Sequence, residues 1–517
     1  MKNPHSARYY RILFRHAGFL ESTTMTAKLI FGSLERSGAE IDERAARLAG
    51  GLAGLGVDDG DVVAVMLRND PAYVDIIQGC RIAGAYYCQI NWHFKSDEAG
   101  LILADCGARV LFIQPDLLTT IAGAIPPHVR VIVVGQAQAD DTGFENWLAA
   151  QAPYAGPPRT PRGHMAYTSG TTGRPKGVRR LPPTPEQQVL AAQVAKDALG
   201  IYPDVRSLLS APLYHSAPSS FAQQSLLQGT LFVLEEKFDA EATLALIERH
   251  RIETAYLVPV MYVRLLRLPP EVRSRYDLSS LSFVASTGSP CAPEVKKAMI
   301  EWLGLVIFEA YASSETGYIT VMPPHEAARK AGSAGKAVGN AAIRILDDAG
   351  HALSNGEIGI IYAHQPAYSD FTYHGNDAAR RAIERDGLVS VGDMGYLDDE
   401  GFLFICDRAS DMVISGGVNI YPAEIEHVLI TLPGVADCAV IGIPDDEFGE
   451  ALAAQVVAET GATLDAAAIR KALGERIAGY KVPRRIDIVE ALPRDDNGKV
   501  VKRRIRDAYW NGKSRRI

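Results

Sequence analysis

Cysteine is scarce in this chain of 517 residues, and none of it is arranged for metal binding. The six cysteines form no CxxC pair and have no histidine at metal-ligand spacing, which argues against zinc sites and disulfide frameworks. We therefore expect free, buried thiols in a reducing compartment at Cys80, Cys88, Cys106, Cys291, Cys406 and Cys438.

Long hydrophobic runs and an excess of positive charge are also missing. No stretch approaches the ~20 apolar residues of a membrane span, and residues 1–19 lack the apolar core of a signal peptide. The formal charge of −8 does not favour nucleic-acid binding. We therefore expect a globular cytoplasmic protein that has no integral membrane segment and does not bind nucleic acid.

The stretch from Tyr167 to Val178 has the composition of a phosphate-binding loop. Glycines allow successive N–H groups to point into one concavity, hydroxyls add donors, and Arg174 and Lys176 supply positive charge. No Lys-Ser or Lys-Thr pair follows the second glycine, so this is not a Walker A motif. The alternative, a mobile surface turn, leaves the many donors and the stiffening Pro175 without a purpose. We expect a helix-like run to follow the stretch.

Short apolar runs alternate with helical patterns through most of the chain, and the run Asp61–Leu67 is typical of a buried strand. This alternation predicts an α/β fold, with a large N-terminal domain of doubly wound sheets. Residues 340–406 change to short strands and turns, which predicts a small β-rich subdomain. A polar cluster then precedes a compact α+β unit. The predicted divisions are an N-terminal domain at 1–406, a hinge at 407–411 and a C-terminal domain at 412–517.

Five motifs in this order resemble those of the adenylate-forming superfamily, which includes acyl-CoA synthetases, luciferases and the adenylation domains of peptide synthetases. The resemblance covers nearly the whole chain. Ala312 and Ser314 depart from the glycine and threonine that are usual in the family. The motifs are the phosphate loop Tyr167–Val178, Tyr311–Thr316, Gly392–Tyr396, the junction Asp407–Arg408 and the lysine loop Pro493–Lys499.

The resemblance implies a mobile C-terminal domain and an N-terminal AMP-binding domain that uses ATP and Mg²⁺. Lys499 would bridge the incoming carboxylate and the α-phosphate, and Glu315 would hold Mg²⁺ with Thr168. Arg408 is the third implied catalytic residue, beside Lys499 and Glu315. Asp393 would accept hydrogen bonds from the ribose, and Tyr311 would stack on the adenine. The implied nucleotide-binding residues are Thr168, Ser169, Gly170, Thr171, Thr172, Gly173, Lys176, Gly288, Ser289, Tyr311, Ser314, Asp393 and Arg408.

The segment Ile414–Glu426 resembles the form found in acyl-CoA synthetases, in which Ser415, Gly416 and Gly417 would contact coenzyme A. The implied reaction is an ATP-dependent ligation of a carboxylic acid to CoA, through an acyl-AMP and with release of pyrophosphate. Because Lys499 would have to leave before the glycines arrive, we expect the small domain to rotate near Ser410.

The acid itself is the least defined part of the hypothesis, and fatty, aromatic and bulky ring-bearing acids all stay open. For His215, which is expected near the acid, a purely structural role stays open too. Two rival functions remain: an acyl-adenylate ligase that loads a carrier protein, and a nucleotide-binding scaffold without activity. A homodimer is kept open as the assembly. The expected walls of the acyl pocket are His215, Phe221, Val258, Met261 and Thr287.

Overall fold

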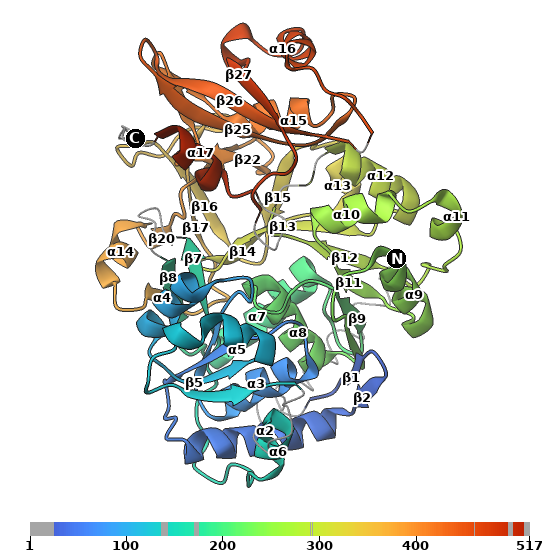
Figure 1. The fold of residues 1–517 in the computed structure, drawn as a ribbon, viewed down its shortest axis with the longest axis vertical. Coiled ribbons are helices and arrows are strands. Elements are labelled where there is room, and N and C mark those ends of the chain that lie inside the picture. The colour runs from blue at the N-terminus through green and yellow to red at the C-terminus, as the bar shows by residue number, and fades with distance from the viewer. Residues whose placement is uncertain are drawn as a thin grey trace.

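A computed structural model describes the fold of most of the chain (Figure 1). Several predicted nucleotide and catalytic residues, namely Gly170, Thr171, Thr172, Gly173 and Lys499, lie outside the described residues, and Ser169 is described only in its backbone. Over the described part, no helix is both long and apolar enough to cross a membrane. All six cysteines are free thiols. The described residues are 25–135, 143–169, 175–289, 291, 293–459, 461–494 and 500–510.

The first sheet of the large domain is mostly parallel and has seven strands within the described residues. In spatial order these are β18 (Phe371–Tyr373), β8 (Pro175–Arg180), β7 (His164–Ser169), β4 (Tyr86–Gln89), β3 (Val62–Met66), β5 (Ala108–Ile113) and β6 (Arg130–Val133). Every residue of β3 is buried, as expected of a strand covered on both faces. The predicted strand in the run Asp61–Leu67 is therefore confirmed.

The second sheet joins a parallel half to an antiparallel half. Its strands, as far as the structure describes them, are β19 (Glu384–Arg385), β20 (Leu388–Val389), β17 (Gly359–His364), β21 (Asp393–Leu397), β22 (Leu403–Arg408), β15 (Ser333–Ala337), β14 (Gly317–Met322), β13 (Ile307–Ser313), β12 (Phe283–Ser286), β11 (Thr254–Tyr256), β9 (Arg206–Leu209), β10 (Leu231–Leu234), β1 (Lys28–Phe31) and β2 (Leu34–Arg36), with β16 (Ala342–Leu346) on β17. The pairing turns antiparallel at β13 and β14. The expected β-rich subdomain is thus a continuation of this sheet.

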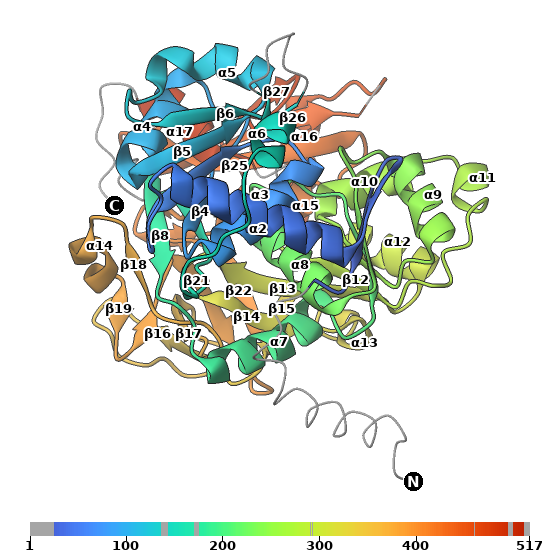
Figure 2. The ribbon, with the colours of Figure 1, turned by 90° about the horizontal axis from the view of Figure 1, so that it is seen from below.

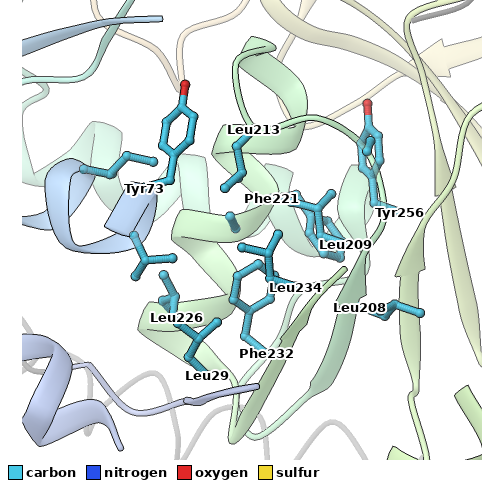
Figure 3. Close-up of a cluster of buried hydrophobic side chains, with 14 of the residues drawn as sticks. Leu29, Tyr73, Leu208, Leu209, Leu213, Phe221, Leu226, Phe232, Leu234 and Tyr256 are labelled. Atoms are coloured by element: carbon cyan, nitrogen blue, oxygen red, sulfur yellow. The ribbon is translucent and has the colours of Figure 1, made fainter. Parts of the chain in front are cut away.

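Helices fill the space between the two sheets. α2 (Gly38–Gly54), α3 (Pro71–Ile82) and α8 (Ser216–Gln228) share one buried cluster with strands of both sheets. Figure 3 shows Tyr73 of α3 and Phe221 of α8 beside side chains of β1, β9 and β10. On the opposite side of β5 and β6 lie α4 (Ser96–Cys106) and α5 (Pro115–Ile121), as Figure 2 shows. The sheets are therefore covered by helices, which confirms the predicted fold class.

The remaining helices of the large domain lie in the connections between strands. A capping box of Thr184 and Gln187, with Pro185 at the first helical position, begins α7. The elements are α6 (Phe144–Ala149), α7 (Pro185–Leu199), α9 (Ala240–His250), α10 (Pro259–Leu266), α11 (Pro270–Arg273), α12 (Pro293–Leu303), α13 (Pro324–Ala327), α14 (Asp377–Ala382) and the 3₁₀ turn Ala122–Ala124.

A helix follows the glycine-rich stretch as expected, but a strand comes first. β8 begins at Pro175 inside the stretch and ends at Arg180, and the helix α7 begins at Pro185. β8 pairs with β7 on one side and with β18 on the other, so both of its edges are hydrogen-bonded. These ladder bonds override the weak local pattern, which the sequence could not reveal because β18 lies almost two hundred residues further along the chain.

The C-terminal domain has its own core. It contains β23 (Val413–Ser415), β24 (Val418–Ile420), α15 (Pro422–Leu429), β25 (Val435–Asp445), β26 (Gly449–Ala458), α16 (Ala466–Gly474), the 3₁₀ turn Gly479–Lys481, β27 (Arg485–Val489) and α17 (Lys502–Trp510). Its apolar side chains form clusters separate from that of the large domain. In Figure 1 it lies above the large domain. Since β22 ends at Arg408 and β23 begins at Val413, the predicted hinge spans the connection between the domains; its bounds stay a prediction.

Candidate active site

A cavity of about 2050 Å³ lies where the C-terminal domain meets the large domain. Residues of β7, β8, α7 and α8 line it from one side. Residues 500–504 and Arg506, just before and within the first turns of α17, line it from the other. At this rim Arg504 Nη2 of α17 is 3.5 Å from Glu98 Oε1 of α4. Pockets for one small ligand measure about 300–1,000 Å³, so this cavity has room for more than one substrate.

At one end of the cavity Glu315 meets a hydroxyl of β7. Thr168 Oγ1 donates to Glu315 Oε1 at 3.1 Å, and the Tyr373 hydroxyl donates to the same oxygen at 3.1 Å. The ammonium of Lys176 lies 4.9 Å from the centre of the Tyr373 ring. Burial and the nearby Glu315 charge raise the pKa of Tyr373, so it acts as a donor. This end of the cavity brings one cation and three oxygen groups together.

The oxygen groups at this end suit Mg²⁺. The Glu315 side chain is a hard carboxylate ligand in a residue only 7% exposed, and the Thr168 hydroxyl adds a second oxygen beside it. Among the described residues, no group of three His, Cys, Asp or Glu side chains could hold a metal ion without help. A cation bound here would therefore need further oxygens, such as those of phosphate groups and water.

A second carboxylate, Asp393, faces the cavity from β21. It is 8% exposed and accepts a hydrogen bond of 2.6 Å from the Tyr311 hydroxyl. Arg408 Nε lies 3.3 Å from its other oxygen, because Asp393 and Arg408 are register partners on β21 and β22. Burial and the Asp393 charge raise the pKa of Tyr311. Asp393 is thus held in place and still reaches the cavity.

The turn that carries Glu315 is fixed by a buried arginine. Arg180, the last residue of β8, donates from Nη2 to the carbonyls of Ser314 at 2.8 Å and Glu315 at 2.7 Å. Its Nη1 donates to the Ser369 carbonyl at 2.7 Å, and burial lowers the pKa of the guanidinium. Ser314 Oγ is also 3.1 Å from Ser216 Oγ of α8. These contacts position the carbonyls on both sides of the Glu315 Cα and leave the Glu315 carboxylate to face Thr168.

The residues expected around the acid divide into two groups. His215 and Thr287 line the cavity, and burial lowers the pKa of His215 to about 3, so this histidine is neutral. Phe221, Val258 and Met261 are buried in the core and do not line the cavity. The Phe221 ring packs edge-on against Tyr256 with their centres 5.6 Å apart, and Tyr256 does line the cavity.

The C-terminal domain presents one loop to the cavity and keeps its glycine hairpin away from it. Arg494 and Val500, the described residues on either side of the lysine loop, both line the cavity. The hairpin at Ser415, Gly416 and Gly417 does not. Both glycines have positive φ, of 57° and 81°, so they form a tight turn between β23 and β24 that side chains would strain.

Comparison with known proteins gives the family. The model of the AMP-binding enzyme family matches residues 21–370, and the model of the AMP-binding enzyme C-terminal domain matches residues 424–499. The chain belongs to the AMP-binding enzyme family. It is 35% identical over 508 residues to an indoleacetate–CoA ligase of Aromatoleum aromaticum, covering 95% of this chain and 96% of the relative.

Two further relatives of this AMP-binding enzyme cover nearly all of the chain. A feruloyl-CoA synthase of an Amycolatopsis species is 34% identical over 478 residues, which are 91% of this chain and 93% of the relative. ATP-bound MatB from Rhodopseudomonas palustris superposes with a TM-score of 0.84 at 27% identity, covering 96% of this chain and 98% of MatB. The resemblance inferred from the motifs is therefore confirmed, and so is the fold.

In this AMP-binding enzyme the cavity gathers nine of the predicted site residues, and their individual roles stay predictions. These nine are Thr168, Lys176, His215, Thr287, Gly288, Ser314, Glu315, Asp393 and Arg408. Predicted residues that are described but do not line the cavity are Phe221, Val258, Met261, Ser289, Tyr311, Ser415, Gly416 and Gly417.

Sequence reasoning missed Arg180. The pair Arg179-Arg180 follows Lys176 closely, but two adjacent arginines usually indicate a solvated surface. The only signal available was alternation: in a strand, Lys176, Val178 and Arg180 point to one face. Recognising β8 as a strand would have placed Arg180 on the same face as Lys176, beside the Glu315 end of the cavity.

Proposed function

We propose that this AMP-binding enzyme is an ATP-dependent acid:CoA ligase that acts on a carboxylic acid and uses Mg²⁺ in the cytoplasm. The observation that carries the proposal is that one cavity joins the Thr168–Glu315 pair, the Asp393–Arg408 pair and the two ends of the lysine loop. The ligase relatives, which act on indoleacetate and ferulate by their names, support a ring-bearing acid as the first class to test.

In the first step a carboxylate oxygen of the acid attacks the α-phosphorus of ATP. The new acyl–oxygen–phosphorus bond forms as the bond between the α- and β-phosphates breaks, and pyrophosphate leaves. Both reactants are anionic, so positioning and positive charge matter more than a base. Lys176 and the loop before it would hold the phosphates, Asp393 would hold the ribose, and Lys499 would bridge the two reacting groups.

Mg²⁺ held by Glu315 and Thr168 would neutralise charge on the departing pyrophosphate. Arg180 would support this end by positioning the backbone, since three of its five N–H donors bind backbone carbonyls. Burial lowers the pKa of His215 to about 3, so it can orient the acid but would carry no charge at neutral pH.

In the second step the sulfur of CoA attacks the acyl carbon. A carbon–sulfur bond forms, the bond to the phosphate oxygen breaks, and AMP leaves, while the thiol proton passes to solvent. Gly416 and Gly417 would border the pantetheine arm, because a turn without side chains lets a chain pass close to the backbone. Since this hairpin does not line the cavity, the step requires the C-terminal domain to rotate about residues 407–411.

The function is tested with a panel of aromatic, fatty and steroid-like acids, each mixed with ATP, Mg²⁺ and CoA. We expect acid-dependent pyrophosphate release together with a CoA thioester detected by mass spectrometry. Pyrophosphate release without thioester would instead support an acyl-adenylate ligase that loads a carrier protein. Absence of acid-dependent pyrophosphate release from every acid would support a scaffold.

The rotation has its own test, a proline at Ser410. Proline fixes φ and should restrict the hinge. We expect Ser410→Pro to change the ratio of the two half-reaction rates, measured separately as pyrophosphate release and as thioester formation from supplied acyl-AMP. If both rates match those of the wild type, the hinge is not at Ser410.

A further inference from the structure

Part of the cavity lining lies beside the end formed by Thr168 and Glu315 and makes no direct contact in the proposed reaction. We call this part the basic lobe and define it by four cavity-lining residues: Arg81 in the last turn of α3, Gln89 at the end of β4, His164 at the start of β7 and Arg180 at the end of β8.

The two strands under the basic lobe connect it to the phosphate-binding end. β4 and β7 are parallel, with Tyr87 opposite His164 and Gln89 opposite Ala166. Alternate residues of a strand share a face, so His164 and Thr168 point to the same side of β7. Four residues at about 3.3 Å each separate them by about 13 Å. A molecule lying along β7 could therefore reach from the reacting phosphate region to the basic lobe.

The basic lobe has two guanidinium groups, and neither makes an ion pair with a carboxylate of a described residue. Arg81 Nη1 donates to the neutral Gln78 Oε1 at 2.8 Å, and its buried Nε has no hydrogen-bond partner in the part of the chain that the structure describes. Arg180 is used by backbone carbonyls. Burial and the Arg180 charge lower the pKa of His164 to about 4, so His164 adds no charge at neutral pH.

Arg81 is packed among polar groups, not among acids. Its charge acts on the Tyr87 hydroxyl, whose ring is 6.1 Å from that of His164, and Tyr87 is 3.4 Å from Ser219 of α8. Burial lowers the pKa of Arg81, because the charged form has lost water without gaining a counter-charge. The carboxyl end of α3 offsets only part of this cost, since a helix terminus carries only a partial charge.

Another cavity arginine, Arg162, has a protein counter-charge, although its buried Nε, like that of Arg81, has no hydrogen-bond partner among the described residues. Arg162 also lines the cavity, but its Nη2 is 2.9 Å from Asp59 Oδ2, and its guanidinium lies 5.5 Å from the centre of the Tyr86 ring. Arg162 thus has a protein counter-charge. Arg81 has no such counter-charge among the described residues, and an anionic group of a ligand could supply one.

We infer that the acid activated by this enzyme carries a second anionic group, most simply a second carboxylate, which Arg81 binds in the basic lobe. The inference rests on the proposed function, because it assigns a substrate class to the same reaction. A guanidinium binds a carboxylate with two parallel hydrogen bonds, and such a pair compensates best when both groups are shielded from water. Arg81 would act on binding and orientation, and the first carboxylate would react at the phosphate-binding end.

The test compares matched acids on the intact enzyme. Aliphatic and aromatic dicarboxylic acids of increasing length are each paired with their monomethyl esters, which keep one carboxylate and nearly the same shape. We expect kcat/KM for the thioester-forming reaction to favour the diacid over its half ester, with the largest ratio at one length. The difference should lie mainly in KM, because the distal group is held before and during reaction.

The variant Arg81→Met keeps the length of the side chain and removes the charge. Leaving a buried charge unpaired costs 2 kcal/mol or more, so kcat/KM for the best diacid should fall at least about 30-fold. The half ester should be affected little, and Arg81→Lys should keep part of the preference. The matched control, Arg162→Met, should leave the ratio of diacid to half ester unchanged.

The outcomes separate the inference from the proposed function. If wild-type enzyme treats diacids and half esters alike at every length, or prefers half esters, the second anionic group is excluded even though acids are ligated. The wild-type ratio decides this even where Arg81→Met fails to fold. If no acid of any class gives pyrophosphate or thioester, the proposed function itself fails.

Discussion

Two loops of the C-terminal domain differ in where they lie relative to the cavity. The ends of the lysine loop, Arg494 and Val500, line it, and α17 lies on the side of the domain that faces the large domain (Figure 1). The glycine hairpin at Gly416 and Gly417 does not line it. Both loops are predicted to serve one reaction. Under the proposed roles of the two loops, a single arrangement of the domains would serve one half-reaction, so mutations in the two loops should separate the two rates.

The largest expected effect comes from the loop at the cavity. Lys499→Ala should lower acid-dependent pyrophosphate release by about 10²–10³-fold, because a preorganised charge at the reacting phosphate is lost. Thioester formation from supplied acyl-AMP should be retained at least in part. Lys481→Ala is the control, since Lys481 is used in an ion pair with Glu424 at 2.6 Å. Equal loss of both half-reactions would contradict the division of roles between the two loops.

The next effect concerns the end of the cavity formed by Glu315 and Thr168. Glu315→Gln keeps the shape of the side chain but removes the charge that would hold Mg²⁺. Pyrophosphate release should fall about 100-fold, and more Mg²⁺ should be needed for half-maximal rate. A titration of the rate against Mg²⁺ measures this. The surface variant Glu400→Gln, which breaks a pair with Arg329, should change neither quantity. An unchanged Mg²⁺ requirement in Glu315→Gln would remove Glu315 from the metal site.

A smaller effect is expected at the hairpin. Gly417 has φ of 81°, and an L-residue there costs about 1–2 kcal/mol. Gly417→Ala should slow thioester formation from acyl-AMP about tenfold and leave pyrophosphate release unchanged. Gly401→Ala is matched to it, because Gly401 has φ of 79° and also has open space around the position of a Cβ, but lies in the turn between β21 and β22. If both variants slow the same step equally, the effect is one of stability.

The smallest effect is expected at His215. Burial lowers its pKa from 6.5 to about 3, so the unfolded chain binds a proton between these values and the folded protein does not. Its contribution to stability is present above pH 6.5 and is lost as the pH falls toward 3. In His215→Asn the melting temperature should fall less steeply between pH 6.5 and 4. The pH profile of kcat/KM between 6 and 9 should keep its shape, and a lost ionisation there would show that His215 titrates in the reaction.

Much of the fold could be predicted because its signals are local. The run around Val62–Met66 is continuous and apolar, as a strand covered on both faces requires. The family could be recognised because its motifs lie within short stretches. Neither prediction needed knowledge of which distant segments meet.

The parts of the fold and of the site that could not be predicted depend on contacts between segments that are distant in the sequence. β8 is a strand because β18 covers its free edge, and Arg180 is buried because the turn at Ser314 comes to lie against it. From the sequence alone, Arg81 would be interpreted as an ordinary cation in the last turn of a helix. Its position in the cavity follows only from the pairing of β7 with β4. Phe221 is apolar and lies close in sequence to His215, which lines the cavity. Only the packing shows that Phe221 contacts Tyr256 and does not itself line the cavity.

The pairing of Asp393 with Arg408 joins the nucleotide site to the hinge through two adjacent strands. Arg408 is the last residue of β22, and the segment after it is held by α17 through Arg506, which donates to the Ser410 carbonyl at 2.8 Å. If Asp393 binds the ribose, nucleotide affinity and the orientation of the C-terminal domain are thermodynamically linked. If the rotation changes the affinity for AMP by some factor, binding of AMP changes the equilibrium constant of the rotation by the same factor. Product release and return of the domain would then be two coupled equilibria, each shifting the other by the same factor.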